Sequence, residues 1–217
     1  MKKMIFDFIF FNQEYCYICK EDKTENLICN SCLERLEFID GSFLVDNKPV
    51  YYPIFYNNYI KEIIKAFKFH KKTYLVKPLA AILFKYISQK KELKDIELLT
   101  YIPMEQGALF DRGFNQAYLL AKELASLMDV EVVSLIEKNK KTREQNKVSL
   151  TQRKENIKNS FQGVKDCNIY GKNVLLIDDI VTTGYTLIEA SSAIQINNNV
   201  NIKFLTITSS RIGESDD

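Results

Sequence analysis

Residues 174–186 read VLLIDDIVTTGYT, the most informative stretch of the 217-residue chain. Its apolar start predicts a buried strand, and this strand ends in two carboxylates, Asp178 and Asp179. A loop with threonines and one glycine follows, and a helix is expected over residues 186–196. In open α/β sheets, ligands bind beyond the carboxyl ends of the strands. The stretch therefore predicts a ligand site together with an α/β fold.

The groups in this loop suit a ligand that carries a phosphate. Gly184 lets the backbone come close to a ligand, and Thr182, Thr183 and Thr186 supply hydroxyl donors. The helix N-terminus adds free N–H groups and a partial positive charge. Two adjacent carboxylates repel a bare phosphate, so we expect them to bind hydroxyl groups or a divalent cation. A phosphate, a sugar diol and Mg²⁺ satisfy every group, whereas helix capping alone explains one threonine.

The composition excludes several other classes of protein. Hydrophobic residues make up 46% of the chain and charged residues 27%, with a net charge of +2. These values exclude a fully disordered chain and a protein coated in basic residues. The patterns GxxxxGK[ST] and GxGxxG are both missing, which argues against nucleoside triphosphate hydrolysis and dinucleotide binding. A single histidine excludes chemistry that needs a His pair in one chain.

Strand and helix patterns alternate along the rest of the sequence. Helical spacing of apolar residues predicts helices from residue 58 onward and over 76–88. A composition rich in Ala, Leu, Lys and Glu predicts a helix over 115–127. Strands are expected at 97–102, 130–136, 174–177 and 202–208. This alternation predicts an α/β domain with a mostly parallel sheet and helices on both faces.

Four of the five cysteines form two CxxC pairs: Cys16, Cys19, Cys29 and Cys32. Each CxxC hairpin points two sulfurs at one place, and two hairpins complete the tetrahedron that structural Zn²⁺ prefers. Disulfides, buried thiols and a redox role are the alternatives. Disulfides fit poorly in a chain without a convincing secretion signal. We expect a closed, structural zinc site in an N-terminal module of residues 1–45.

The opening MKKMIFDFIFF shares two lysines and an apolar run with signal peptides. Asp7 interrupts the run, and no small-residue cleavage site follows before Tyr15 and Cys16. The sequence has no stretch of about 18 uncharged apolar residues, so we expect no membrane span. A cytoplasmic location is the interpretation that these features favour.

Residues 174–186 resemble the phosphoribosyl-pyrophosphate signature of type I phosphoribosyltransferases: a hydrophobic stretch, two acidic residues, then TTGxT. Two further segments are similar to the ComF family of competence proteins, of the ComFC type. The first is Pro103 with the run from Arg112 to Gln116. The second matches through Arg143, Asn146, Leu150, Arg153, Asn156 and Phe161. An N-terminal module with four cysteines is also usual in that family.

The resemblance implies a type I phosphoribosyltransferase-like fold for residues 46–217. It implies that the acidic pair holds the ribose hydroxyls and that the threonine loop, which includes Tyr185, holds the 5′-phosphate. Arg112, Arg143 and Arg153 are expected among the ligand-binding residues, and the two aspartates are the catalytic candidates.

Two departures from the family pattern affect the expected pyrophosphate contacts. The family's first loop arginine is missing near Met104, and the glutamine of the second segment is displaced to Gln145.

The function that the resemblance implies is binding of phosphoribosyl pyrophosphate in natural competence. The protein would handle incoming single-stranded DNA on the cytosolic side, with other DNA-uptake proteins as partners. The alternative is an active phosphoribosyltransferase, in which an acceptor displaces pyrophosphate from C1 of the ribose with Mg²⁺ on the leaving group. The sequence offers no general base near the signature beyond the two aspartates, so turnover does not follow from it.

Two segments are strongly basic. Residues 138–158 hold eight Lys and Arg against two acids, and residues 59–77 hold six lysines against Glu62. They can form a solvated face, close over the pyrophosphate as a loop, or follow a nucleic-acid backbone. Aromatic residues near the second segment are candidates for stacking on bases: Tyr56, Tyr59, Phe67 and Phe69.

Overall fold

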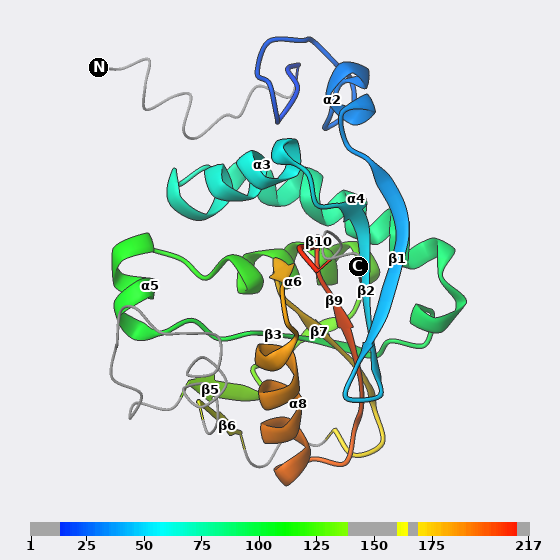
Figure 1. The fold of residues 1–217 in the computed structure, drawn as a ribbon, viewed down its shortest axis with the longest axis vertical. Helices are drawn as coiled ribbons and strands as arrows, with labels where there is room; N and C mark the ends of the chain where they lie inside the picture. The colour runs from blue at the N-terminus through cyan, green and yellow to red at the C-terminus, as the bar shows by residue number, and fades with distance from the viewer. Residues whose placement is uncertain (1–13, 139–159, 165–168, 212–217) are drawn as a thin grey trace, which may run out of the picture.

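A mostly parallel β-sheet forms the middle of the molecule (Figure 1). The structure is a computed structural model, and it describes residues 14–138, 160–164 and 169–211. The strands are β1 (Phe38–Val45), β2 (Lys48–Phe55), β3 (Leu98–Tyr101), β4 (Glu131–Val132), β5 (Ile136–Lys138), β6 (Phe161–Gly163), β7 (Asn173–Ile177), β8 (Ile180–Val181), β9 (Asn201–Leu205) and β10 (Thr208–Ser209). The helices are α2 (Asn30–Glu34), α3 (Asn58–Phe69), α4 (Val76–Gln89), α5 (Gln106–Arg112), α6 (Gln116–Met128) and α8 (Tyr185–Asn197).

The strands of the main sheet follow the order β4-β3-β7-β9-β2-β10-β8, and all neighbours on this path are parallel. The remaining strand, β1, pairs antiparallel with β2. A separate two-stranded sheet joins β5 to β6. The signature strand β7 lies between β3 and β9, so it is a central strand of the sheet.

Both faces of the sheet are buried, as the sequence predicts. Along β7, Val174 and Leu176 belong to one apolar cluster, whereas Leu175 and Ile177 belong to the other. Helices α3, α4 and α6 contribute to the cluster of Leu175, and α8 contributes to the cluster of Leu176. A continuous apolar run in a strand that is buried on both faces is typical of a parallel sheet between layers of helices. The predicted α/β architecture is confirmed.

The sequence predicts only part of the hairpin of β1 and β2: Pro49 and Pro53 flank residues 50–52, which are typical of a strand or an extended connector, and these residues lie in β2. Gly41 interrupts the apolar pattern of β1, but the ring of Tyr52 packs over it and leaves no room for a Cβ atom. The hairpin turns at Asp46 and Asn47, which have φ angles of 51° and 59°. Such left-handed pairs favour the tight turns of hairpins. This turn coincides with the predicted module boundary at residue 45, and the division itself stays a prediction.

Two strands predicted as single runs are divided. The run 130–136 splits because β4 pairs with β3 in the main sheet, and the chain then leaves that sheet so that β5 can pair with β6. The run 202–208 splits between β9 and β10, which lie on opposite sides of β2. A continuous apolar pattern does not reveal such changes of partner.

The cysteine-bearing segment packs against the N-terminal half of α3 (Figure 1). Cys16, Cys29 and Cys32 belong to the same buried cluster as Ile60 and Ile63 of that helix. The segment is therefore part of the main core. Within the described ranges, no helix has the length and apolar character needed to cross a membrane.

Candidate functional site

The two aspartates follow β7 at the carboxyl edge of the sheet. The Asp178 N–H donates to the Leu205 carbonyl at 3.1 Å, and the Ile207 N–H donates to the Asp179 carbonyl at 3.1 Å. The Asp179 N–H donates to Asp178 Oδ1 at 2.8 Å. These hydrogen bonds fix the acidic pair to the chain that follows β9.

The environments of the two carboxylates differ. Asp179 is only 3% exposed, and its Oδ1 lies 2.8 Å from Lys68 Nζ at the end of α3. Its Oδ2 is buried without a hydrogen-bond partner in the described part of the chain. Asp178 keeps part of its surface exposed. Burial first, and the charge of Asp179 second, raise the pKa of Asp178 to about 7.

A pocket of about 240 Å³ opens beside Asp178. Arg112, Lys138 and Glu105 contribute charged groups to its wall. The Arg112 guanidinium donates to Gln116 Oε1 and lies 4.9 Å from the centre of the Phe69 ring. The structure thus brings together two residues that the sequence selected far apart in the chain, Asp178 and Arg112.

The threonine loop connects β8 to α8. Thr182 and Thr183 are exposed, whereas Tyr185 and Thr186 are partly buried in the first helical turn. Gly184 is the N-cap, with a φ of +83°, and no side chain among the described residues caps the helix. The N-terminus of a helix favours an anion, and the role of this one in binding a phosphate stays a prediction.

Gly184 is required for a reason that the sequence did not show. A Cβ atom on this residue would lie 2.7 Å from Val45 Cγ2 and 2.8 Å from Val45 Cγ1. The sequence predicts that Gly184 lets the backbone come close to a ligand, and a side chain here would also meet the end of β1. Gly184 thus lets the loop pack closely on the β1–β2 hairpin.

Several predicted residues lie outside the described ranges. Arg143 and Arg153 fall in residues 139–159, together with most of the basic segment of residues 138–158. Lys138 is described, and it lines the pocket of Asp178. The roles of the two arginines stay predictions.

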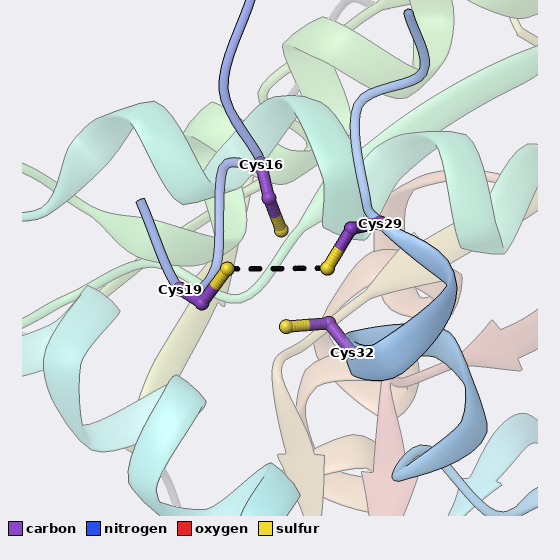
Figure 2. A group of neighbouring side chains, drawn as sticks. All are labelled: Cys16, Cys19, Cys29 and Cys32. Carbon is purple, nitrogen blue, oxygen red and sulfur yellow. Dashed lines mark hydrogen bonds between the residues drawn. The ribbon is translucent and has the colours of Figure 1, made fainter. Parts of the chain in front are cut away.

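The four cysteines point their sulfurs at one another (Figure 2). All four Sγ atoms lie within 4.8 Å of one another, and Cys19 and Cys29 are 3.9 Å apart. Zinc bonds of about 2.3 Å in a tetrahedron place sulfurs about 3.8 Å apart. A disulfide needs about 2.05 Å, and the four thiols are free. This cluster can hold a metal ion.

The thiols sit in contrasting electrostatic environments. Burial raises the pKa of Cys16, but backbone N–H donors from Cys29, Cys19 and Ile18 outweigh it and lower the pKa to about 7. Burial raises the pKa values of Cys29 and Cys32. Burial, followed by the nearby Cys32 thiol, raises the pKa of Tyr59, the second residue of α3. Metal-free thiols at Cys29 and Cys32 thus hold their protons, and a cation is needed to stabilise the full set of thiolates.

Sequence reasoning did not assign a role to Lys68, which contacts the signature directly. A weak signal existed: Lys68 follows the buried Ile64 by four residues, so it borders the apolar face of α3. Its partner could not be inferred, because Asp179 is distant in sequence.

Comparisons with known proteins agree with the sequence resemblance. The family model described as "Phosphoribosyl transferase domain" matches residues 114–217. Competence protein F of Haemophilus influenzae is 27% identical over 172 residues, covering 77% of this chain and 72% of that protein. Competence protein ComFC of Bacillus subtilis is 30% identical over 173 residues, covering 79% and 68%. DNA utilization protein YhgH of Escherichia coli is 25% identical over 142 residues, covering 64% and 62%.

Among solved structures, adenine phosphoribosyltransferase of Saccharomyces cerevisiae is 16% identical with a TM-score of 0.41, covering 83% of this chain and 89% of that one. The adenine phosphoribosyltransferase of Thermoanaerobacter pseudethanolicus is 15% identical with a TM-score of 0.41, covering 64% and 82%. Both TM-scores are low.

Proposed function

The chain belongs to the ComF family of competence proteins, of the ComFC type with a phosphoribosyltransferase-like fold, and we propose that it binds phosphoribosyl pyrophosphate together with Mg²⁺. We further propose that it handles incoming single-stranded DNA in the cytoplasm, alongside other DNA-uptake proteins. The observation that carries the proposal is the position of Asp178: it lines a pocket together with the cationic side chains of Arg112 and Lys138, and the threonine loop follows it closely in the chain.

Each part of phosphoribosyl pyrophosphate has a counterpart in this arrangement. Asp178 accepts hydrogen bonds from ribose hydroxyls, since its carboxylate is the one that reaches the pocket. The loop from Thr182 to Thr186 and the uncapped end of α8 bind the 5′-phosphate. Arg112 and Lys138 face the pyrophosphate, and Mg²⁺ offsets its remaining charge.

The ion in the cysteine cluster is Zn²⁺ in this proposal. Four sulfurs at the distances given above match a closed tetrahedral site, and such sites stabilise the fold. A catalytic role for this zinc is disfavoured, because four protein ligands leave no position for a substrate.

Ligand-induced stabilisation tests the phosphoribosyl pyrophosphate site. The ligand with Mg²⁺ should raise the melting temperature of the wild-type protein, because binding to the folded state alone adds RT ln(1 + [L]/Kd). Asp178→Asn should reduce this rise. Asp129→Asn is the matched control, since Asp129 ends α6 in a left-handed conformation that Asn also tolerates. An equal response of all three proteins would contradict the assignment of Asp178.

Turnover is the second candidate function. The observation in its favour is the place of Asp178 in the wall of the pocket, where burial and the charge of Asp179 raise its pKa to about 7. A general base with such a pKa suits proton transfer near neutral pH, here from an acceptor that attacks C1 of the ribose. A screen for pyrophosphate release across nucleophilic acceptors tests it. Release that requires both an acceptor and Asp178 would support an enzyme, and no release with any acceptor would favour a binding protein.

The support for DNA handling comes from the basic end of α3. Of the four stacking candidates, Phe67 is fully buried, whereas Phe69 is 63% exposed. Arg112 stacks on Phe69, and Phe110 of the same short helix as Arg112 is 88% exposed. Lys71 and Lys72 follow α3 and are exposed. Exposed aromatic rings among cations are typical of surfaces that bind single strands through stacking and phosphate contacts.

Binding to single-stranded DNA at several salt concentrations tests this surface. The slope of log K against log salt should be about −0.7 for each phosphate that the protein neutralises. Charge reversal at Lys71 and Lys72 should flatten this slope and leave zinc content unchanged. Binding that is absent or independent of salt would refute the DNA part of the proposal alone.

A further inference from the structure

We propose that Lys68 is a positioning residue of the ligand site: it holds Asp179 in place, so that the acidic pair can present Asp178 to the ribose. This inference rests on the proposed binding of phosphoribosyl pyrophosphate. It adds a residue that lies far from the signature in sequence, on a helix that forms no part of the threonine loop.

The first support is the geometry of the pair. Lys68 Nζ lies 2.8 Å from Asp179 Oδ1, and the side chains are only 20% and 4% exposed. A partly buried ion pair at this distance is screened little by salt. Lys68 is the one basic residue in the last turn of α3, where the helix dipole also favours a cation. The lysine is therefore held between its own helix end and the aspartate.

The second support is the cost of leaving Asp179 unpaired. The Asp179 Oδ2 atom is already buried without a partner in the described ranges. Removing the ammonium would leave a buried carboxylate with neither oxygen paired to a cation, and such a charge is strongly unfavourable. The Asp179 side chain would then move outward. This movement reaches Asp178, because the two residues are adjacent and the Asp179 N–H donates to Asp178 Oδ1.

The third support is that α3 is anchored at its other end. Asn57 Oδ1 accepts hydrogen bonds from the N–H groups of Tyr59 and Ile60, which fixes the start of the helix. Tyr59 neighbours Cys32 in the cysteine cluster, and Arg35 lies 3.9 Å from the centre of the Tyr59 ring. Because the start of α3 is fixed and its apolar face is buried, the helix holds Lys68 in one position beside Asp179.

Substitution of Lys68 by Met tests the role, because Met keeps the length of the side chain and removes the charge. Lys68→Arg keeps the charge and is the conservative rescue variant. Lys65→Met is the matched control, since Lys65 lies on the same helix, is exposed, and is 3.7 Å from Glu62. Calorimetric titrations use three probes, each with Mg²⁺: phosphoribosyl pyrophosphate, ribose 5-phosphate and inorganic pyrophosphate.

We expect Lys68→Met to weaken phosphoribosyl pyrophosphate and ribose 5-phosphate by about tenfold or more, which corresponds to about 1.4 kcal/mol. Pyrophosphate binding should stay within about twofold of wild type, because Arg112 and Lys138 are the residues proposed to bind that part of the ligand. Lys68→Arg should restore most of the affinity, and Lys65→Met should have no effect. A role in folding alone would weaken all three probes together and lower the melting temperature of the free protein.

A double substitution supplies the second measurement. In an Asp179→Asn background, Lys68→Met should have little further effect on ribose 5-phosphate, because the buried charge is already gone. Unchanged or tighter binding by Lys68→Met, or effects that simply add in the double variant, would overturn the role of Lys68 alone. No binding of phosphoribosyl pyrophosphate by the wild-type chain would overturn the proposed function and this role together.

Discussion

Substitution of Gly184 by Ala is expected to destabilise the protein through contact with the β1–β2 hairpin. Gly184 has a φ of +83°, and a Cβ atom there would lie 2.7 Å from Val45 Cγ2. Gly113 has the same φ of +83°, but no atom of the described residues lies within 4 Å of its Cβ position. The two glycines therefore separate backbone strain from steric overlap.

The expected magnitudes follow from these two effects. An alanine in the left-handed region costs roughly 1–2 kcal/mol, which is the whole effect expected for Gly113→Ala. Gly184→Ala adds the overlap with Val45, and overpacking of a buried site typically costs about 1–3 kcal/mol more. The free energy of unfolding should therefore fall by about 2–5 kcal/mol for Gly184→Ala.

Urea denaturation measures both variants on one scale, provided that the m-value stays that of the wild type. A Val45→Ala background removes the two methyl groups that collide with the new Cβ atom. In that background the loss caused by Gly184→Ala should approach the loss caused by Gly113→Ala, because the two sites are coupled through one contact. Equal losses at both glycines in the wild-type background would refute the close packing of the loop on β1.

Three further predictions concern the metal, the acid and the aromatic surface. Elemental analysis should find about one zinc per chain. Cys29→Ser should unfold the cysteine segment, because the metal affinity of such sites supplies on the order of 10 kcal/mol of folding energy. A folded protein that contains no metal and whose four thiols are all alkylated would contradict this prediction. The pKa of Asp178 rises from 3.8 to about 7 on folding. Between pH 3.8 and about pH 7 the folded state therefore binds a proton at Asp178 that the unfolded state does not bind, and the free energy of unfolding falls as pH rises through this range. The free energy of unfolding of Asp178→Asn, measured in urea titrations relative to wild type, should therefore increase from pH 4 to pH 8. A difference that does not increase with pH would contradict the raised pKa of Asp178. Phe110→Ala should weaken single-stranded DNA binding by roughly 1–3 kcal/mol in anisotropy titrations. Tyr170→Ala removes another exposed ring, near the opposite end of β7, and should not weaken binding. Equal losses of affinity in the two variants would show that Phe110 is not part of the DNA-binding surface.

Sequence patterns predicted the elements whose signal is local. The strand β7 and the helix α6 could be predicted because each has a local signal of its own: a purely apolar run in β7 and a composition rich in Ala, Leu, Lys and Glu in α6. The CxxC pairs predicted a cluster because two residues between cysteines let both sulfurs reach one ion. Asp178 and Arg112 were selected by separate motifs, and the fold brings them to one pocket.

The features that were missed depend on contacts between distant segments. Gly41 looks like an interruption in sequence, yet it is where the Tyr52 ring packs across the hairpin. The role of Lys68 depends on Asp179, which is more than a hundred residues away. The sequence also does not show that Asp179 is buried and Asp178 partly exposed, because nothing in the local pattern distinguishes two adjacent carboxylates. Long-range packing decides all three, and periodicity along the chain does not record it.

The most direct test of the central claim is a calorimetric titration of the zinc-loaded protein with phosphoribosyl pyrophosphate and Mg²⁺. We expect saturable binding at one site per chain. We also expect Asp178→Asn to weaken this binding by about 1.5–3 kcal/mol, the contribution of a hydrogen bond to a charged group. Folded, zinc-loaded protein that releases no heat of binding up to millimolar ligand would contradict a phosphoribosyl pyrophosphate site in this chain.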